Sequence, residues 1–218
     1  MKIVREKLIK FYDERAHDAG RGSDVSALTA LWGEDLLLGV LQHYWRSEGA
    51  ESEILSYSCS TGNRKGPRLD GWLLKRSCGT EFLYQVEVKN WAAYSLGERQ
   101  LEFAASEEEL RRYSEEQWKH YFGGDTIPAP SVAKVLVEMK KPDGYDGWQV
   151  TPLLCFWFFI AESLESSYSR HHYPDGRAVH VFSASAYLRS IKEEFIEISM
   201  PRAERRLKLL SDLIDKNA

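Results

Sequence analysis

The sequence is poor in cysteine and contains no long apolar run. Its 218 residues include three cysteines, an odd number, and none has the spacing of a metal-ligand pair. This pattern argues against a disulfide framework and a cysteine-ligated zinc site, so we expect a reducing, cytoplasmic setting. The longest apolar stretch, residues 152–161, is too short to span a bilayer, and the first residues are charged rather than signal-like. We therefore expect no membrane partner.

Extremes of composition and of net charge are also absent. The chain is 43% hydrophobic and 28% charged, which is ordinary for a globular protein, and residues 1–218 fit one domain. Its net charge of −4 lacks the excess of cations typical of nucleic-acid binders. The local field at a cleft matters more than the global charge, so this absence does not exclude nucleic acid as a partner.

The most informative pattern is a predicted β-hairpin with charged residues at its open end. Residues 69–76 have the pattern of one strand, and residues 81–89, rich in aromatic and β-branched side chains, have that of the next. A tight turn centred on Cys78 and Gly79 would place Asp70 directly opposite Glu87. Lys89 would share their face, because residues two apart on a strand point to the same side.

This arrangement predicts a metal site. Two carboxylates that face each other across a sheet repel by up to about 1 kcal/mol unless positive charge lies between them. With no cysteine or histidine beside them, a hard ion such as Mg²⁺ or Mn²⁺ suits these oxygens best. The simpler alternative is that Glu87 and Lys89 form a solvent-facing pair and Asp70 begins a strand. The apolar neighbours of Glu87 favour a buried strand end, where charges need partners.

Asp70 and the tripeptide Glu87-Val88-Lys89 resemble the motif of the PD-(D/E)xK nuclease superfamily. The literal proline–aspartate pair is missing, although Pro67 lies three residues before the acid. The resemblance implies that Asp70 and Glu87 bind Mg²⁺ or Mn²⁺, with the carbonyl of Val88 as a backbone ligand. It also implies that Lys89 orients the attacking water.

The resemblance implies an α/β fold of the restriction-endonuclease-like type. Its α-β-β-β-α-β core is a mixed sheet flanked by helices, here with strand and helix additions at the C-terminus. The predicted elements are a helix over residues 24–45, strands over 52–60, 69–76 and 81–89, a helix over 106–122, strands over 132–140, 152–160 and 178–182, and a helix over 202–216. Residues 171–172, two adjacent histidines, are expected in a surface loop.

Glu34 is a further candidate catalytic acid on the first predicted helix. It interrupts a stripe of apolar residues at helical spacing, namely Leu31, Leu38, Leu41 and Trp45. A carboxylate in such a face is costly unless it is protonated, hydrogen-bonded or linked to a metal. Superfamily members often place an acid on this helix. The alternatives are a surface-edge glutamate, or a different helix rotation with Asp35 as the inward acid.

Candidate substrate contacts fall in two places. The loop before the first acid contains Arg64, Lys65 and Arg68, which could meet phosphates near the metal, although a solvated loop explains them as well. Gln117 and Tyr121 match a Q-x-x-x-Y pattern found in some nuclease branches, and their spacing puts them on one helical face. Their simpler explanation is a core tyrosine with a polar neighbour.

The sequence therefore predicts a metal-dependent nuclease, with DNA as the expected substrate. One context is the cutting subunit of a restriction or defence system whose partner protein recognises the target, because the sequence has no obvious separate recognition domain. The leucine-rich C-terminal helix is of a kind that usually packs on its own domain, and the alternative is a homodimer contact, since cutting both strands of a duplex commonly uses two active sites. The alternative hypothesis is a non-catalytic, nuclease-like module that binds nucleic acid or a partner protein.

Overall fold

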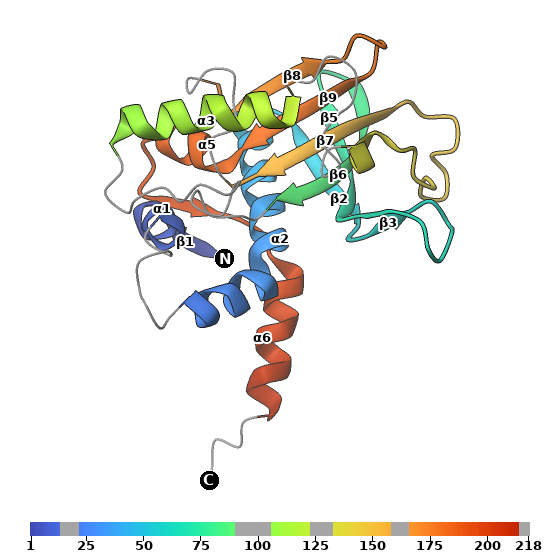
Figure 1. Cartoon of the computed structure of the whole chain (residues 1–218). Helices are drawn as coiled ribbons and strands as arrows, with labels where there is room; N and C mark the ends of the chain where they lie inside the picture. The colour runs from blue at the N-terminus through green and yellow to red at the C-terminus, as the bar shows by residue number, and fades with distance from the viewer. Residues whose placement is uncertain (14–21, 90–105, 123–132, 158–165, 214–218) are drawn as a thin grey trace.

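The centre of the protein is a mixed six-stranded sheet, seen in Figure 1. The computed structural model describes residues 1–13, 22–89, 106–122, 133–157 and 166–213, without the side chains of residues 22–28 and part of those of residues 107–121. The strands, in spatial order, are β2 (Glu51–Ser56), β5 (Gly71–Ser77), β6 (Thr80–Lys89), β7 (Val150–Phe156), β9 (Ala178–Ser183) and β8 (Tyr168–His172). The predicted α/β class with a mixed sheet is confirmed.

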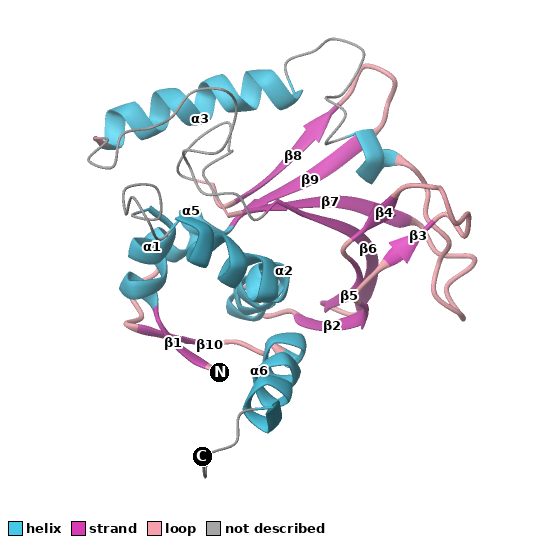
Figure 2. Ribbon diagram, turned by 60° about the horizontal axis from the view of Figure 1, so that its bottom comes forward, coloured by secondary structure: helices cyan, strands magenta, loops and turns pink. Residues whose placement is uncertain are grey.

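Helices cover both faces of this sheet. Strand β7 is parallel to β6 and to β9, and the other neighbours are antiparallel. Helix α2 (Gly22–Ser47) lies on one face and α3 (Glu107–Phe122) on the other, as Figures 1 and 2 show. The ring of Trp45 in α2 lies 5.1 Å from that of Tyr84, and Phe122 in α3 lies 4.9 Å from His171. Covered faces are what internal parallel strands require.

Smaller elements complete the described structure. Helix α5 (Ala184–Ser190) contacts both α2 and α1 (Arg5–Asp13), and α6 (Pro201–Leu213) contacts α2 and projects from the body (Figure 1). Two short pairings are β1 (Lys2–Val4) with β10 (Phe195–Glu197) and β3 (Cys59–Ser60) with β4 (Arg68–Leu69). A 3₁₀ turn, η3, spans Lys134–Leu136. Across the described ranges, every helix is too short or too polar to cross a membrane.

The hairpin forms with the predicted register. Ser77 pairs with Thr80 and Gly71 with Val86, so the turn is centred on residues 78 and 79. Cys78 has a φ of 50° and Gly79 a φ of 75°, the pair of positive values that a type I′ turn requires. This turn matches the twist of the strands, and it fixes which residues meet at the open end of the hairpin.

The second predicted helix is also confirmed. Helix α3 begins after Ser106, whose hydroxyl accepts a hydrogen bond from the Glu109 N–H at 3.3 Å. The Glu109 carboxylate in turn accepts from the Ser106 N–H at 2.7 Å. These reciprocal bonds form the expected capping box.

The strand predicted over residues 132–140 is wrong. The described part of this segment contains η3 and no strand, because both edges of β6 are already occupied by β5 and β7. Instead the buried Gln85 side chain donates hydrogen bonds to the carbonyls of Val135 and Val137 and accepts one from the Met139 N–H. Gln85 therefore replaces a strand ladder as the anchor of this segment.

Two other segments differ from the sequence expectation. The strand predicted over 152–160 begins earlier, as β7, and residues 158–160 lie outside the described chain. The adjacent histidines 171 and 172 belong to the edge strand β8, so the predicted loop is wrong there. The predicted C-terminal helix is present as α6, and residues 214–216 of the prediction lie outside the described chain.

Replacing Gln85 tests the anchoring of the η3 segment. Gln85→Met should lower the free energy of unfolding by about 2–4 kcal/mol, because two carbonyls and one N–H lose their buried partner. Urea denaturation measures this, with the exposed Gln149→Met as the matched control. A loss below about 0.5 kcal/mol, the scale of ordinary surface substitutions, would contradict the anchoring role.

Candidate active site

The predicted acidic cluster lies where the parallel strands β6 and β7 end. Glu87, Val88 and Lys89 are the last residues of β6, and Lys89 pairs with Phe156 at the end of β7. Asp70 immediately precedes β5, at the same open end of the hairpin. Open α/β sheets bind ligands outside the carboxyl ends of their strands, so this edge is a favourable place for a site.

Asp70 extends the hairpin ladder with its own side chain. Its N–H donates to the Val86 carbonyl at 2.9 Å, and its carboxylate Oδ2 accepts from the Val88 N–H at 2.7 Å. The carboxylate therefore lies beside the last residues of β6, on the edge that β5 occupies further along but does not cover here. The N–H and C=O of a strand residue point to the same edge, so the Val88 carbonyl is directed toward Asp70 as well.

Glu87 is a buried carboxylate held by two lysines. It is 2% exposed, and its Oε1 lies 2.5 Å from both Lys89 Nζ and Lys134 Nζ. Its other oxygen, Oε2, is buried and has no hydrogen-bond partner among the described residues. A buried charge is stable only when it is paired. The two lysines provide partners for Oε1, whereas Oε2 has none among the described residues.

The environment of Asp70 favours its protonated form. Burial, followed by repulsion from the Glu87 carboxylate, raises the pKa of Asp70 from 3.8 to about 7. Glu34 adds a smaller repulsion, whereas the Val88 N–H and the Lys134 ammonium act in the opposite direction. Asp70 and Glu87 are thus electrostatically coupled, as expected for two carboxylates in one site.

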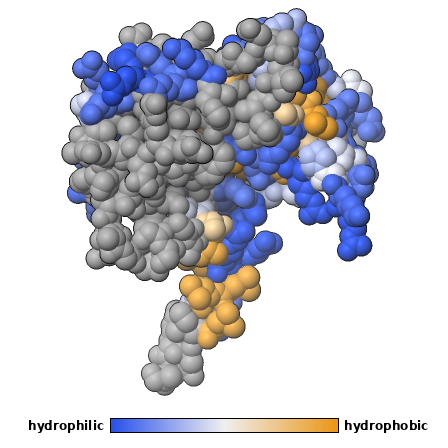
Figure 3. All heavy atoms as spheres, in the orientation of Figure 1, coloured by the Kyte–Doolittle hydropathy of each residue, from blue (hydrophilic) through white to orange (hydrophobic). Residues whose placement is uncertain are grey.

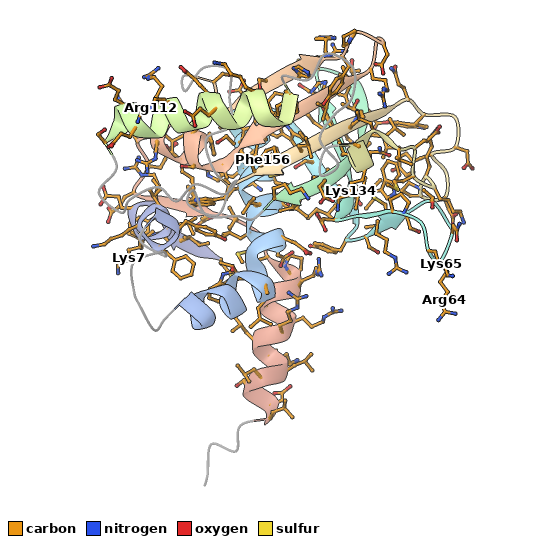
Figure 4. The ribbon with its side chains drawn as sticks, in the orientation of Figure 1. Lys7, Arg64, Lys65, Arg112, Lys134 and Phe156 are labelled. Carbon is orange, nitrogen blue, oxygen red and sulfur yellow. The ribbon has the colours of Figure 1, made fainter. Side chains whose placement is uncertain are left out.

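Lys134 is a site residue that the sequence analysis missed. It lies in η3, within the segment expected to form a strand, and Figure 4 shows it beside β6. The sequence did contain a signal, because Lys134 interrupts the apolar run from Val132 to Val137. A cation in such a run needs a partner, as an acid does.

Glu34 lies at the margin of the site. Its carboxylate is 45% exposed and accepts a hydrogen bond from Arg202 of α6 at 3.0 Å. The predicted apolar stripe is buried at Leu38, Leu41 and Trp45, but its first residue, Leu31, is 48% exposed, and Glu34 lies next to that exposed end. Asp35, at 2% exposure, is the inward acid, and its Oδ2 accepts from the Ala203 N–H at the start of α6. The buried acid of α2 is therefore Asp35, as in the alternative, and Glu34 lies at the edge of the buried face.

The predicted substrate contacts are spread over the surface. Arg64 and Lys65 are exposed in the β3–β4 loop and point away from the sheet in Figure 4. Arg68 is exposed in β4, and its carbonyl lies 3.5 Å from Lys134 Nζ. The side chains of Gln117 and Tyr121 lie outside the described part of the chain.

The donor set fits a cation that takes few protein ligands. Within the described residues no three His, Cys, Asp or Glu side chains form a metal-binding group. Mg²⁺, however, is often bound through one or two carboxylates, with water and substrate phosphates completing its shell. Asp70, the partnerless Oε2 of Glu87 and the Val88 carbonyl would supply such a partial set.

A large open cleft lies at the opposite end of the strands. Its lining includes Tyr84 near the start of β6, Trp148, and the β8 and β9 residues Arg170 and His180. None of the acids of the candidate site lines it. The size of that cleft therefore does not bear on the chemistry at Asp70 and Glu87.

Comparisons with family models, with curated proteins and with solved structures found no match to this chain.

The raised pKa of Asp70 predicts how stability depends on pH. Between about pH 4 and 7 the folded protein retains a proton that the unfolded chain releases, so the metal-free protein should lose stability as the pH rises through this range. Asp70→Asn keeps an acceptor for the Val88 N–H but cannot ionise. This variant should be more stable than wild type at pH 8 by up to about 4 kcal/mol, because the shift of roughly three pKa units corresponds to about 1.4 kcal/mol per unit.

Urea denaturation in a chelating buffer at pH 5 and pH 8 checks this expectation. The exposed Asp212→Asn is the control, and it should keep the wild-type difference between the two pH values. Equal pH dependence in wild type and in Asp70→Asn would show that Asp70 ionises normally.

Proposed function

We propose that this protein is a metal-dependent nuclease of the restriction-endonuclease-like fold, with DNA as its substrate. The observation that supports this most strongly is the partnerless, buried Oε2 of Glu87 beside Asp70, whose ionisation Glu87 opposes. A divalent cation would satisfy both acids at once. Lys89 is already in contact with Glu87.

The order of elements supports the same proposal. Helix α2 is followed by three antiparallel strands, β2, β5 and β6, then by α3 and the parallel strand β7. This order agrees with the α-β-β-β-α-β core expected for the PD-(D/E)xK superfamily, with Asp70 just before the second of these strands and Glu87 near the end of the third. Strands β8 and β9 and helix α6 would be additions to that core.

In the proposed mechanism, Asp70, Glu87 and the Val88 carbonyl hold Mg²⁺ or Mn²⁺. The bound ion would lower the pKa of water and polarise the phosphoryl oxygen. Lys89 would orient the attacking water and stabilise the charge that develops on the phosphate. Glu34 would act through water, since its carboxylate lies at the margin of the site.

Surface residues supply candidate contacts to DNA and to partners. Arg64, Lys65 and Arg68 would bind backbone phosphates, with Gln117 and Tyr121 as further contacts. Helix α6 exposes an apolar row that Figure 3 shows on the projecting helix, formed by Leu207, Leu209, Leu210 and Leu213. This row would suit a homodimer or the partner subunit of a restriction or defence system. The buried free thiols of Cys59 and Cys155 agree with a cytoplasmic setting.

The alternative function is a nuclease-like module that binds nucleic acid or a partner protein without cutting. Lys134 favours this alternative, because it already neutralises Glu87 without a metal. Metal-dependent cleavage of plasmid DNA, single-stranded DNA and RNA distinguishes the two functions. Absence of cleavage on all three would favour the binding module.

Two substitutions separate metal binding from chemistry. Glu87→Gln should weaken Mg²⁺ binding and abolish cleavage, because it removes an anionic ligand. Lys89→Ala should abolish cleavage while Mg²⁺ affinity stays the same or rises slightly, because a nearby positive charge is lost. Calorimetric Mg²⁺ titration beside a plasmid-nicking assay measures both effects.

Exposed residues outside the candidate site provide matched controls for Glu87→Gln and Lys89→Ala. Glu197→Gln and Lys192→Ala make the same chemical changes and should leave binding and cleavage at wild-type levels. Full cleavage by both site variants would show that the chemistry lies elsewhere in the chain.

The β3–β4 loop can be tested separately. Arg64→Ala combined with Lys65→Ala should weaken DNA binding uniformly across sequences and reduce the slope of log K against log salt by about 2, because two phosphate contacts are lost. Fluorescence anisotropy with labelled duplexes at several salt concentrations measures this slope. An unchanged slope would mean that the loop is only solvated.

A further inference from the structure

Lys134 is the more exposed of the two lysines that hold Glu87. Both ammonium groups lie 2.5 Å from Glu87 Oε1, but the Lys134 side chain is 34% exposed, against 10% for Lys89. The ammonium of Lys134 also lies 3.5 Å from the Arg68 carbonyl. Lys134 therefore reaches the site from the solvent side, whereas Lys89 belongs to the strand itself.

The backbone beneath Lys134 is fixed, while its side chain can move. Val135 is fully buried, and Gln85 holds the carbonyls of Val135 and Val137. The lysine stem has four rotatable bonds and a strongly hydrated ammonium. The ammonium can thus leave Glu87 for water without any change in η3.

The charges around Glu87 make Lys134 a competitor of a cation. Its ammonium lies 2.5 Å from Glu87 Oε1 and neutralises that carboxylate, as a metal between the two acids would. A divalent ion at these carboxylates would repel an ammonium only a few ångströms away. The metal and the Lys134–Glu87 pair therefore oppose each other.

We propose that Lys134 is an internal counter-ion of the metal site, which a divalent cation displaces from Glu87. This inference depends on the proposed function, because it requires that Asp70 and Glu87 bind a metal. In the metal-free protein Lys134 stabilises the buried carboxylate. After displacement its ammonium lies at the solvent side of the site, where it can contact a phosphate of the nucleic acid.

Metal titration of Lys134 variants tests the displacement. Lys134→Met should bind Mg²⁺ and Mn²⁺ about fivefold or more tightly than wild type, because the metal no longer has to break an ion pair. Lys134→Arg keeps the charge and should bind them as wild type does. Isothermal titration calorimetry gives the dissociation constants.

A control and a second measurement exclude a general charge effect or a folding defect. Lys140→Met removes an exposed cation of the same segment, for which the described residues show no contact with Glu87, and it should leave metal affinity within about twofold. Without metal, Lys134→Met should melt at a lower temperature than wild type, and Mg²⁺ should raise its melting temperature by more. If Lys134→Met does not fold without metal, Lys134→Gln, which can still donate a hydrogen bond, serves in its place.

The outcomes separate this inference from the proposed function. If wild type binds metal and Lys134→Met binds it equally or more weakly, the displacement is wrong and the metal site stands. If Lys140→Met raises the metal affinity as much as Lys134→Met does, the loss of any nearby positive charge explains the result, and the displacement is again wrong. If wild type and all variants bind neither ion at millimolar concentration, the proposed function fails, and the displacement fails with it.

Discussion

The buried carboxylate of Glu87 is the constraint on which the candidate site depends. A charge at 2% exposure requires compensation, and the chain supplies two ammonium groups from different elements, Lys89 from β6 and Lys134 from η3. This requirement links the end of the sheet to the segment after α3. One carboxylate oxygen still lacks a partner in the described structure, and Asp70 is held nearby with a raised pKa. The site therefore offers a cation two ligands, the partnerless oxygen of Glu87 and the carboxyl group of Asp70.

The part of this arrangement that follows from local rules was predictable from the sequence. The turn at Cys78 and Gly79 sets the register of the hairpin, and the register alone brings Asp70 opposite the end of β6. The Ser106 capping box fixed the start of α3 in the same way. Short-range backbone geometry is encoded by a few neighbouring residues, so a single sequence reveals it.

The parts that depend on distant packing were not predictable. Residues 132–140 have strand-like composition, but no free sheet edge is left beside β6, and Gln85 holds the segment instead. Lys134 reaches Glu87 only because of that anchor. The rotation of α2 likewise depends on α6, whose backbone Asp35 caps, and this contact spans 168 positions in sequence. Apolar spacing could not decide between Glu34 and Asp35, because the middle of α2 is buried nearly all round.

The central claim is that Asp70 and Glu87 together bind a divalent cation. Anomalous scattering from crystals grown with Mn²⁺ tests this most directly, because it locates the ion without reference to activity. We predict an anomalous peak within about 2.0–2.3 Å of oxygens from both carboxylates, the usual distance between oxygen ligands and Mg²⁺ or a first-row divalent metal ion. Crystals soaked at millimolar Mn²⁺ that show no peak at these acids, or a peak bound by other residues alone, would contradict it.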